Sequence, residues 1–83
     1  MKIAFKLFAS LTDYLPPERL GNRVELDVDG DTTIANLVAR YRVPERSAHL
    51  VLVNGVFVPP SERASRRLAE GDELAIWPPI AGG

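Results

Sequence analysis

The sequence contains no cysteine, which excludes a disulfide framework, a cysteine-bound zinc cluster and a thiol nucleophile. It also lacks an excess of charge, since ten basic and eleven acidic side chains give a net charge of −1. A general nucleic-acid or anionic-membrane binder would carry a basic excess, so we expect neither partner. No apolar run approaches the roughly 18–20 residues of a membrane span, and the N-terminal stretch turns polar too early for a signal peptide. We therefore expect a single-domain cytoplasmic protein.

The chain offers little for catalysis or metal binding. The one histidine, His49, precedes an apolar stretch and belongs to no recognisable Ser/His/Asp set, so a structural role is expected. The run "DVDGD" at 27–31 resembles the start of a calcium loop, but Val38 occupies the position where such a loop needs a bidentate Glu. A basic cluster, formed by Arg63, Arg66 and Arg67, is either solvated surface or a docking site for an acidic partner. We expect no bound metal or cofactor, and no catalysis by the chain alone.

Apolar periodicity predicts the secondary structure. Alternation over 2–8 and 23–28 predicts two strands, and "LVLVNGVFV" at 50–58 predicts a hairpin, because Asn-Gly tolerates positive φ at both turn positions. Residues 73–77 read as a last strand, and a short helical turn is expected to open at Pro60. Between 31 and 41 the spacing becomes helical, with an apolar stripe at Ile34, Leu37, Val38 and Tyr41. Asp31, Thr32 or Thr33 can cap this helix, and Pro44 is expected to end it.

This order of elements predicts a β-grasp, or ubiquitin-like, fold of the α+β class. One amphipathic helix must cover one face of a mixed sheet of four to five strands to make a single core. The first and last strands are expected to lie parallel at the centre of the sheet. We expect residues 1–77 to form this domain and residues 78–83 to form an extended, flexible tail.

The outward face of the two central strands is unusually apolar. Ala4 and Phe8 of the first strand, and Ala75 and Trp77 of the last, point away from the predicted core side. Apolar patches on a surface often mark interaction sites, and Trp is enriched among binding hot spots. The loop before Leu68 could instead fold back and cover this patch. Both interpretations remain open from the residues alone.

The chain ends "WPPIAGG". Pro78 and Pro79 cannot donate ladder hydrogen bonds, so they end the last strand and favour an extended chain that reaches roughly 20 Å at about 3.3 Å per residue. Gly82 and Gly83 have no Cβ, so the terminal carboxylate could enter a narrow tunnel that a side chain would block. This suits a carboxylate that reacts in a partner's active site after activation, for example as an acyl-adenylate.

The last sixteen residues, "LAEGDELAIWPPIAGG", resemble the C-terminal signature of the MoaD/ThiS family of ubiquitin-like sulfur carriers. The Gly-Asp turn, the apolar strand, the Pro-Pro pair and the "AGG" end occur in the family's order. The stretch "KLFASLTDYL" likewise resembles the first strand and following loop of MoaD. The Pro78-Pro79 pair favours the MoaD branch, the small subunit of molybdopterin synthase.

The resemblance implies a mechanism and partners. Gly83 would be adenylated by an E1-like, MoeB-like enzyme that uses ATP, and a sulfur donor system would convert it to a thiocarboxylate. The tail would insert into a MoaE-like large subunit, where the sulfur passes to the pterin precursor of the molybdenum cofactor. The docking face would contain Phe8, Trp77, Ala75 and Ala4. The threading residues would be Pro78, Pro79, Ile80, Ala81 and Gly82.

Other functions remain open. Trp77 stands where Phe is expected in a typical MoaD, and the arginine-rich loop before the last strand is short. The alternatives are a ThiS-like carrier for thiazole or tungsten-cofactor synthesis, a ubiquitin-like modifier joined through Gly83 to lysines of target proteins, and a β-grasp binding domain whose terminal glycines are incidental.

Overall fold

The structure is a computed structural model that describes residues 1–79, and the expected tail residues Ile80, Ala81, Gly82 and Gly83 lie outside the described residues. Within residues 1–79, five strands form one sheet and four helical segments connect them. The strands are β1 (Lys2–Leu7), β2 (Arg23–Asp27), β3 (Leu50–Val53), β4 (Val56–Phe57) and β5 (Glu73–Trp77). The helical segments are the α-helix α1 (Ile34–Arg40) and the 3-10 helices η1 (Ala9–Tyr14), η2 (Glu45–Ser47) and η3 (Pro60–Glu62).

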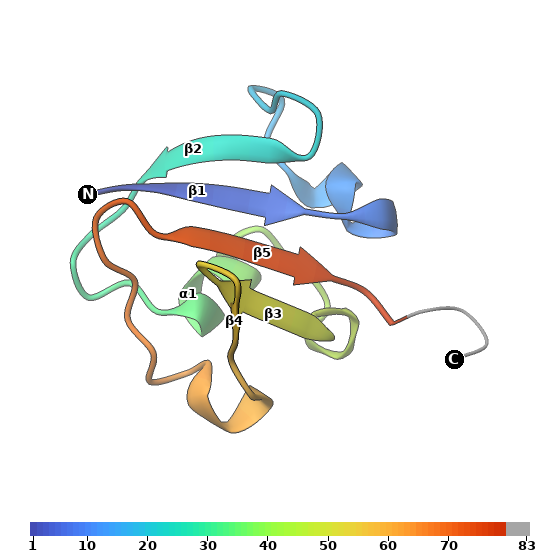
Figure 1. The fold of residues 1–83 in the computed structure, drawn as a ribbon. Coiled ribbons are helices and arrows are strands. Elements are labelled where there is room, and N and C mark those ends of the chain that lie inside the picture. The colour runs from blue at the N-terminus through green and yellow to red at the C-terminus, as the bar shows by residue number, and fades with distance from the viewer. Residues whose placement is uncertain (80–83) are drawn as a thin grey trace.

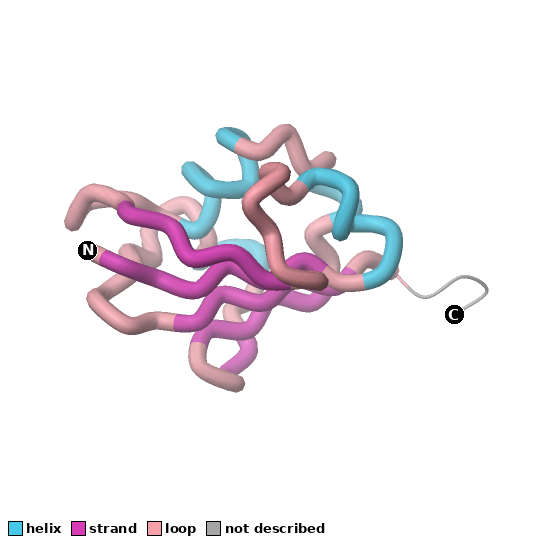
Figure 2. The backbone as a smooth tube through the Cα atoms, turned by 90° about the horizontal axis from the view of Figure 1, so that it is seen from above, coloured by secondary structure: helices cyan, strands magenta, loops and turns pink. Residues whose placement is uncertain are grey.

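The sheet has the order β2-β1-β5-β3-β4. β1 and β5 are parallel, and their arrows point the same way in Figure 1. All other neighbouring pairs are antiparallel. Figure 2 shows the strands side by side from a second direction. This mixed five-stranded sheet with one main helix confirms the predicted β-grasp fold.

The core lies between α1 and one face of the sheet. Strand alternation puts Phe5 and Leu7 of β1, and Leu74 and Ile76 of β5, on the face that meets Ile34 and Leu37 of the helix. Seventeen buried apolar side chains form this cluster: Ile3, Phe5, Leu7, Leu11, Leu15, Val24, Val28, Ile34, Leu37, Val43, Ala48, Val51, Val53, Val58, Leu68, Leu74 and Ile76. Within residues 1–79, no helix covers the opposite face of the sheet (Figure 1).

Helix α1 begins with a capping box. Of the three candidates, Thr33 is the cap: its hydroxyl accepts from the Asn36 N–H at 3.1 Å, and the Asn36 amide oxygen accepts from the Thr33 N–H at 2.9 Å. The helix ends at Arg40 and not at Pro44, because Arg42 adopts a left-handed conformation with φ of 61° and reverses the chain first.

Two helical segments depart from the sequence-based expectation. Neither η1, at residues 9–14, nor η2 is among the helical segments predicted from the sequence. Side-chain to backbone bonding supports η1, since the Thr12 hydroxyl donates to the Ala9 carbonyl at 2.8 Å, and Leu11 anchors the segment in the core. One or two turns of 3-10 helix are too short to produce a visible apolar period, so the sequence carried no signal for them.

A buried carboxylate joins the β3–β4 hairpin to the turn before β5. Asp72 is 9% exposed, and its two carboxylate oxygens accept from the Asn54 side-chain amide and the Ala69 N–H, each at 2.8 Å. The Asn54 amide oxygen in turn accepts from the Glu73 N–H at 2.9 Å. Asn54 is able to do this because it occupies the positive-φ position of the predicted Asn-Gly turn, with φ of 52°.

We expect Asp72→Ala to destabilise the fold by about 1–2 kcal/mol, because it removes the acceptor of two partly buried hydrogen bonds, those from the Ala69 N–H and the Asn54 side-chain amide. The measurement is the free energy of unfolding from urea denaturation. Asp29→Ala is the matched control, since Asp29 is exposed and its loss should cost less than about 0.5 kcal/mol. Equal losses from the two variants would contradict this account of Asp72.

Candidate functional site

The base of the tail is fixed by the end of β5. The His49 N–H donates to the Trp77 carbonyl at 3.1 Å, which ties β5 to the start of β3. Pro78 and Pro79 follow, and neither has an N–H with which to continue the ladder. The described part of the tail therefore leaves the sheet immediately after Trp77.

Phe8 and Trp77 stack beside this point. Their ring centroids lie 4.1 Å apart and their planes differ by 6°. The parallel pairing of β1 and β5 produces the contact, because the Phe8 N–H donates to the Ile76 carbonyl at 3.1 Å and brings residue 8 level with Trp77. Both side chains are half-buried. The structure thus brings together two of the residues predicted for the docking face.

The apolar face is larger than the sequence predicted. In the antiparallel register Leu50 pairs with Trp77, Leu52 pairs with Ala75, and Leu52 also pairs with Phe57. Paired residues point to the same side of a sheet, so β3 and β4 extend the patch across the open face. Leu50 is 37% exposed and Phe57 is 52% exposed. We call the set Phe8, Trp77, Leu50, Leu52 and Phe57 the open-face patch.

Sequence reasoning missed Leu50, Leu52 and Phe57, although a signal for them was present. The run "LVLVNGVFV" is apolar on both faces of its strands, whereas a sheet with one covered face should alternate apolar and polar residues. The other two predicted docking residues, Ala4 and Ala75, lie on the same face but are only 8% and 6% exposed. They form the floor of the patch and offer little surface for contact.

A charged cluster borders the patch on the β2 side. The Lys6 ammonium lies 3.2 Å from the Glu73 carboxylate, and Arg23 lies 3.8 Å from the same residue. Arg23 also lies 3.9 Å from Glu25. An apolar centre with a charged rim is the usual anatomy of a protein–protein interface.

The loop before Leu68 does not cover the open-face patch. Its backbone lies beside α1 on the other side of the sheet: the Ala35 N–H donates to the Arg63 carbonyl at 3.0 Å, and the Ile34 N–H donates to the Arg66 carbonyl at 3.2 Å. The Leu68 N–H then donates to the Thr32 carbonyl at 2.9 Å. Of the two interpretations left open by the sequence, the covered face is wrong.

The described residues hold no catalytic constellation. The ring of His49 is exposed, and its backbone serves the ladder to Trp77. Within residues 1–79, no group of three His, Asp or Glu side chains lies close enough together to hold a metal ion. In the same part of the chain, no helix is long and apolar enough to cross a membrane. The geometry instead presents an apolar face next to the start of a tail.

Comparisons with known proteins agree with the fold. The model of the ThiS family matches residues 6–83. The crystal structure of SAMP1 from Haloferax volcanii is 30% identical, with a TM-score of 0.68 and full coverage of both chains. A second H. volcanii structure, of small archaeal modifier protein 1, is 29% identical over 95% of this chain and 98% of that one, with a TM-score of 0.67.

A Pyrococcus furiosus protein, described provisionally as molybdopterin converting factor subunit 1, has a TM-score of 0.66 over 95% of this chain and 98% of that one. It is 17% identical, so the likeness shows the shared fold alone. A search of curated proteins found no match.

We expect Phe8→Ala and Trp77→Ala to be non-additive in stability, because each removes the same stacked contact. A double-mutant cycle from urea unfolding should give a coupling energy of about 0.5–1.5 kcal/mol. The pair Tyr14→Ala and Trp77→Ala provides the comparison and should be closer to additive. A coupling near zero for Phe8 and Trp77 would contradict the stacking.

Proposed function

Because the chain belongs to the ThiS family, we propose that it is a ubiquitin-like modifier whose C-terminal Gly83 is activated and joined to amines of other proteins. The family consists of small carrier proteins that are not catalysts themselves, and membership implies an E1-like activating partner. One observation carries the proposal. The Gly-Gly terminus follows the end of β5 by only a few residues, and β5 ends at Trp77, within the open-face patch. The 30% identity to SAMP1, a small archaeal modifier protein by name, supports modification as the use of that terminus.

The proposed chemistry begins with the Gly83 carboxylate. A carboxylate oxygen attacks the α-phosphorus of ATP on the activating enzyme, giving an acyl-adenylate and releasing pyrophosphate. A lysine amine of the target then attacks the acyl carbon, and AMP leaves as the amide bond forms. The glycine carbon is accessible to the nucleophile because it carries no side chain. All catalytic groups in this scheme belong to the activating enzyme and its partners.

The open-face patch supplies the docking surface in this scheme. The activating enzyme would cover Leu50 and Phe57, exclude water from the Phe8–Trp77 stack, and receive the tail from Pro78 onward. Aromatic side chains at the centre of an interface contribute a large share of binding energy. The ion pairs of Lys6 and Arg23 with Glu73 would then lie at the rim, where they affect orientation more than affinity.

Sulfur delivery is the second candidate function, and the Pro78-Pro79 pair shared with MoaD-like tails favours it. Hydrosulfide supplied by a donor system would attack the acyl carbon of the same acyl-adenylate and displace AMP, leaving a thiocarboxylate on Gly83. The tail would then enter a MoaE-like large subunit for molybdopterin synthesis. The likeness to the P. furiosus structure supports the fold needed for this role but not the pathway.

One reconstitution distinguishes the two functions. The full chain is incubated with ATP, the E1-like enzyme of its host and a host protein extract, with and without a sulfur donor, and products are analysed by intact and peptide mass spectrometry. We expect target lysines that carry the C-terminal glycines of this chain, and no product from a Gly83 deletion. An increase in intact mass equal to the replacement of one oxygen by sulfur, without conjugates, would establish the carrier role in place of the modifier role. If an activating enzyme that is active on a control carrier yields neither product with this chain, both candidate functions are contradicted.

We expect Leu50→Asp to raise the KM of the activating enzyme for this chain about tenfold, because a buried carboxylate would face the apolar docking surface. The kcat should change less, since the tail is intact. Val56→Asp is the matched control: Val56 is 65% exposed, but its pairing with Val53 puts it on the other side of the sheet. Equal effects of the two variants on KM would contradict docking through the open-face patch.

A further inference from the structure

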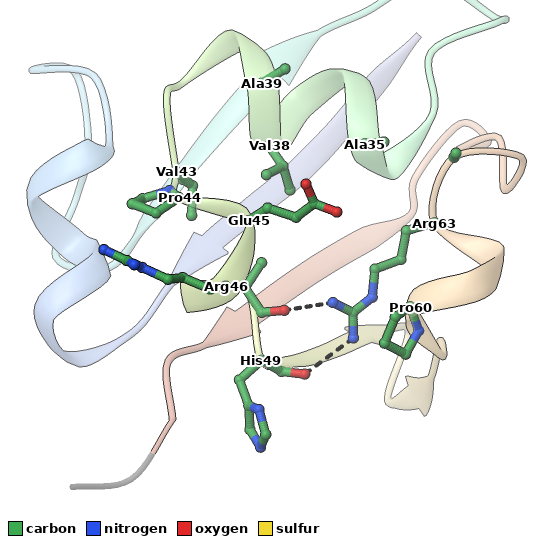
Figure 3. Close-up of a pocket in the computed structure, with 12 residues that line it drawn as sticks. Ala35, Val38, Ala39, Val43, Pro44, Glu45, Arg46, His49, Pro60 and Arg63 are labelled. Atoms are coloured by element: carbon green, nitrogen blue, oxygen red, sulfur yellow. Dashed lines mark hydrogen bonds between the residues drawn. The ribbon is translucent and has the colours of Figure 1, made fainter.

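Lysine is scarce in this chain. Of its ten basic side chains, eight are arginines and two, Lys2 and Lys6, are lysines. Arginine supplies charge without offering a nucleophile, because the guanidinium stays protonated in proteins. The guanidinium of Arg63, for example, donates to two backbone carbonyls just before β3 (Figure 3). Three amines of the chain are therefore candidates to attack an activated carboxylate: those of Met1, Lys2 and Lys6.

The amine of Met1 is bound to the end of β2 and the residue after it. It donates to the Asp27 carboxylate at 3.1 Å and to the Val28 carbonyl at 2.9 Å. The Val28 N–H in turn donates to the Met1 carbonyl at 2.8 Å, which fixes the residue from both sides. An amine has to leave such bonds before its lone pair can attack an acyl carbon. Met1 is therefore a poor acceptor while the N-terminal end of β1 stays paired.

Lys6 belongs to the charged cluster beside the open-face patch. Its side chain is 26% exposed, and its ammonium group lies 3.2 Å from the Glu73 carboxylate. Breaking an ion pair of this kind disfavours the free amine by up to about fivefold. Lys6 also lies two residues before Phe8 on the same side of β1, so a partner that covers the patch covers Lys6 as well. Docking of the activating enzyme therefore blocks this amine.

Lys2 differs from both other amines. Its side chain is exposed, and no carboxylate among residues 1–79 forms an ion pair with its ammonium group. Its backbone is fixed, since the Lys2 N–H donates to the Glu70 carboxylate at 3.0 Å and the Lys2 carbonyl accepts from the Gly71 N–H at 2.8 Å. Lys2 thus presents an unpaired amine from a well-held end of β1.

The position of Lys2 also separates it from the docking surface. Six residues lie between its level in the sheet and that of Phe8, which corresponds to roughly 20 Å at about 3.3 Å per residue. Figure 1 shows the start of β1 and the end of β5 at opposite ends of the sheet. A group attached to Lys2 would leave Phe8, Trp77 and the start of the tail uncovered. A copy that has been modified at Lys2 therefore remains competent for activation.

We propose that Lys2 is the site at which this chain accepts a second copy of itself, so that copies are linked from Gly83 to Lys2. The proposal rests on the proposed function, because it uses the Gly83 adenylate made by the E1-like enzyme with ATP. The Lys2 amine, after losing a proton to water, attacks the acyl carbon of that adenylate. The bond from this carbon to the AMP oxygen breaks, and AMP leaves with the electron pair. The nitrogen then gives its extra proton to water, which leaves an amide.

The test separates the donor from the acceptor. The acceptor is an isotope-labelled chain without Gly83, and the donor is the unlabelled full chain. Both are incubated with ATP, the host's E1-like enzyme and a host protein extract, and the digested products are analysed by mass spectrometry. We expect the C-terminal peptide of the donor on Lys2 of the acceptor. Lys2→Arg should lower modification of the acceptor about fivefold or more, while the matched control Lys6→Arg should leave it within about twofold of the parent.

Circular dichroism establishes that each variant is folded. The proposal is overturned if the donor peptide is found mainly on Lys6 or on the Met1 amine, or if the two lysine variants accept equally. Donor glycines on lysines of the extract proteins, with an unmodified acceptor, would also overturn it and leave the proposed function standing. If neither the extract proteins nor the acceptor is modified, the proposed function fails, and acceptance at Lys2 fails with it.

Discussion

The parallel pairing of β1 with β5 is the constraint on which the rest of the structure depends. It places two strands from opposite ends of the chain side by side, with Phe5 level with Leu74 and Leu7 level with Ile76. The same register brings Phe8 to Trp77, where β5 ends and the prolines begin. Because both strands run in the same direction (Figure 1), Phe8, Trp77 and the start of the tail lie at the same end of the sheet. A partner that binds the patch is therefore already next to the tail.

The two faces of the sheet serve different purposes. One face is closed by α1 and the loops around it, and within residues 1–79 no buried side-chain nitrogen or oxygen lacks a hydrogen-bond partner. The other face keeps large apolar side chains exposed. Such exposure lowers solubility, and exposed apolar patches on folded proteins are therefore often binding sites. The edge strand β4 is only two residues long and is followed by Pro59 and Pro60, which limits strand addition by other chains.

The sequence predicted the fold because its local signals agree with one another. The structure contains each element that a local signal implies. Alternation implies the strands β1 and β2, the helical spacing of Ile34 and Leu37 implies α1, and the Asn-Gly turn implies the β3–β4 hairpin. It predicted that Phe8 and Trp77 share the outward face, through the expected pairing of the first and last strands, but not that their rings stack. The full open-face patch depends on the register of β3 against β5, which pairs Leu50 with Trp77 and is set by tertiary packing. The bonds from the Arg63 guanidinium to the carbonyls of Ala48 and His49 also depend on tertiary packing, and no local pattern specifies them.

The central claim is that the open-face patch recognises the activating enzyme independently of the tail. The most direct test is competition: the chain truncated after Pro79 is added to the adenylation reaction of the full chain with the host's E1-like enzyme. The account predicts competitive inhibition, with an inhibition constant within about tenfold of the KM of the full chain, and loss of that inhibition in truncated Leu50→Asp. Absence of inhibition by a folded truncated chain would contradict the account and assign recognition to the tail alone.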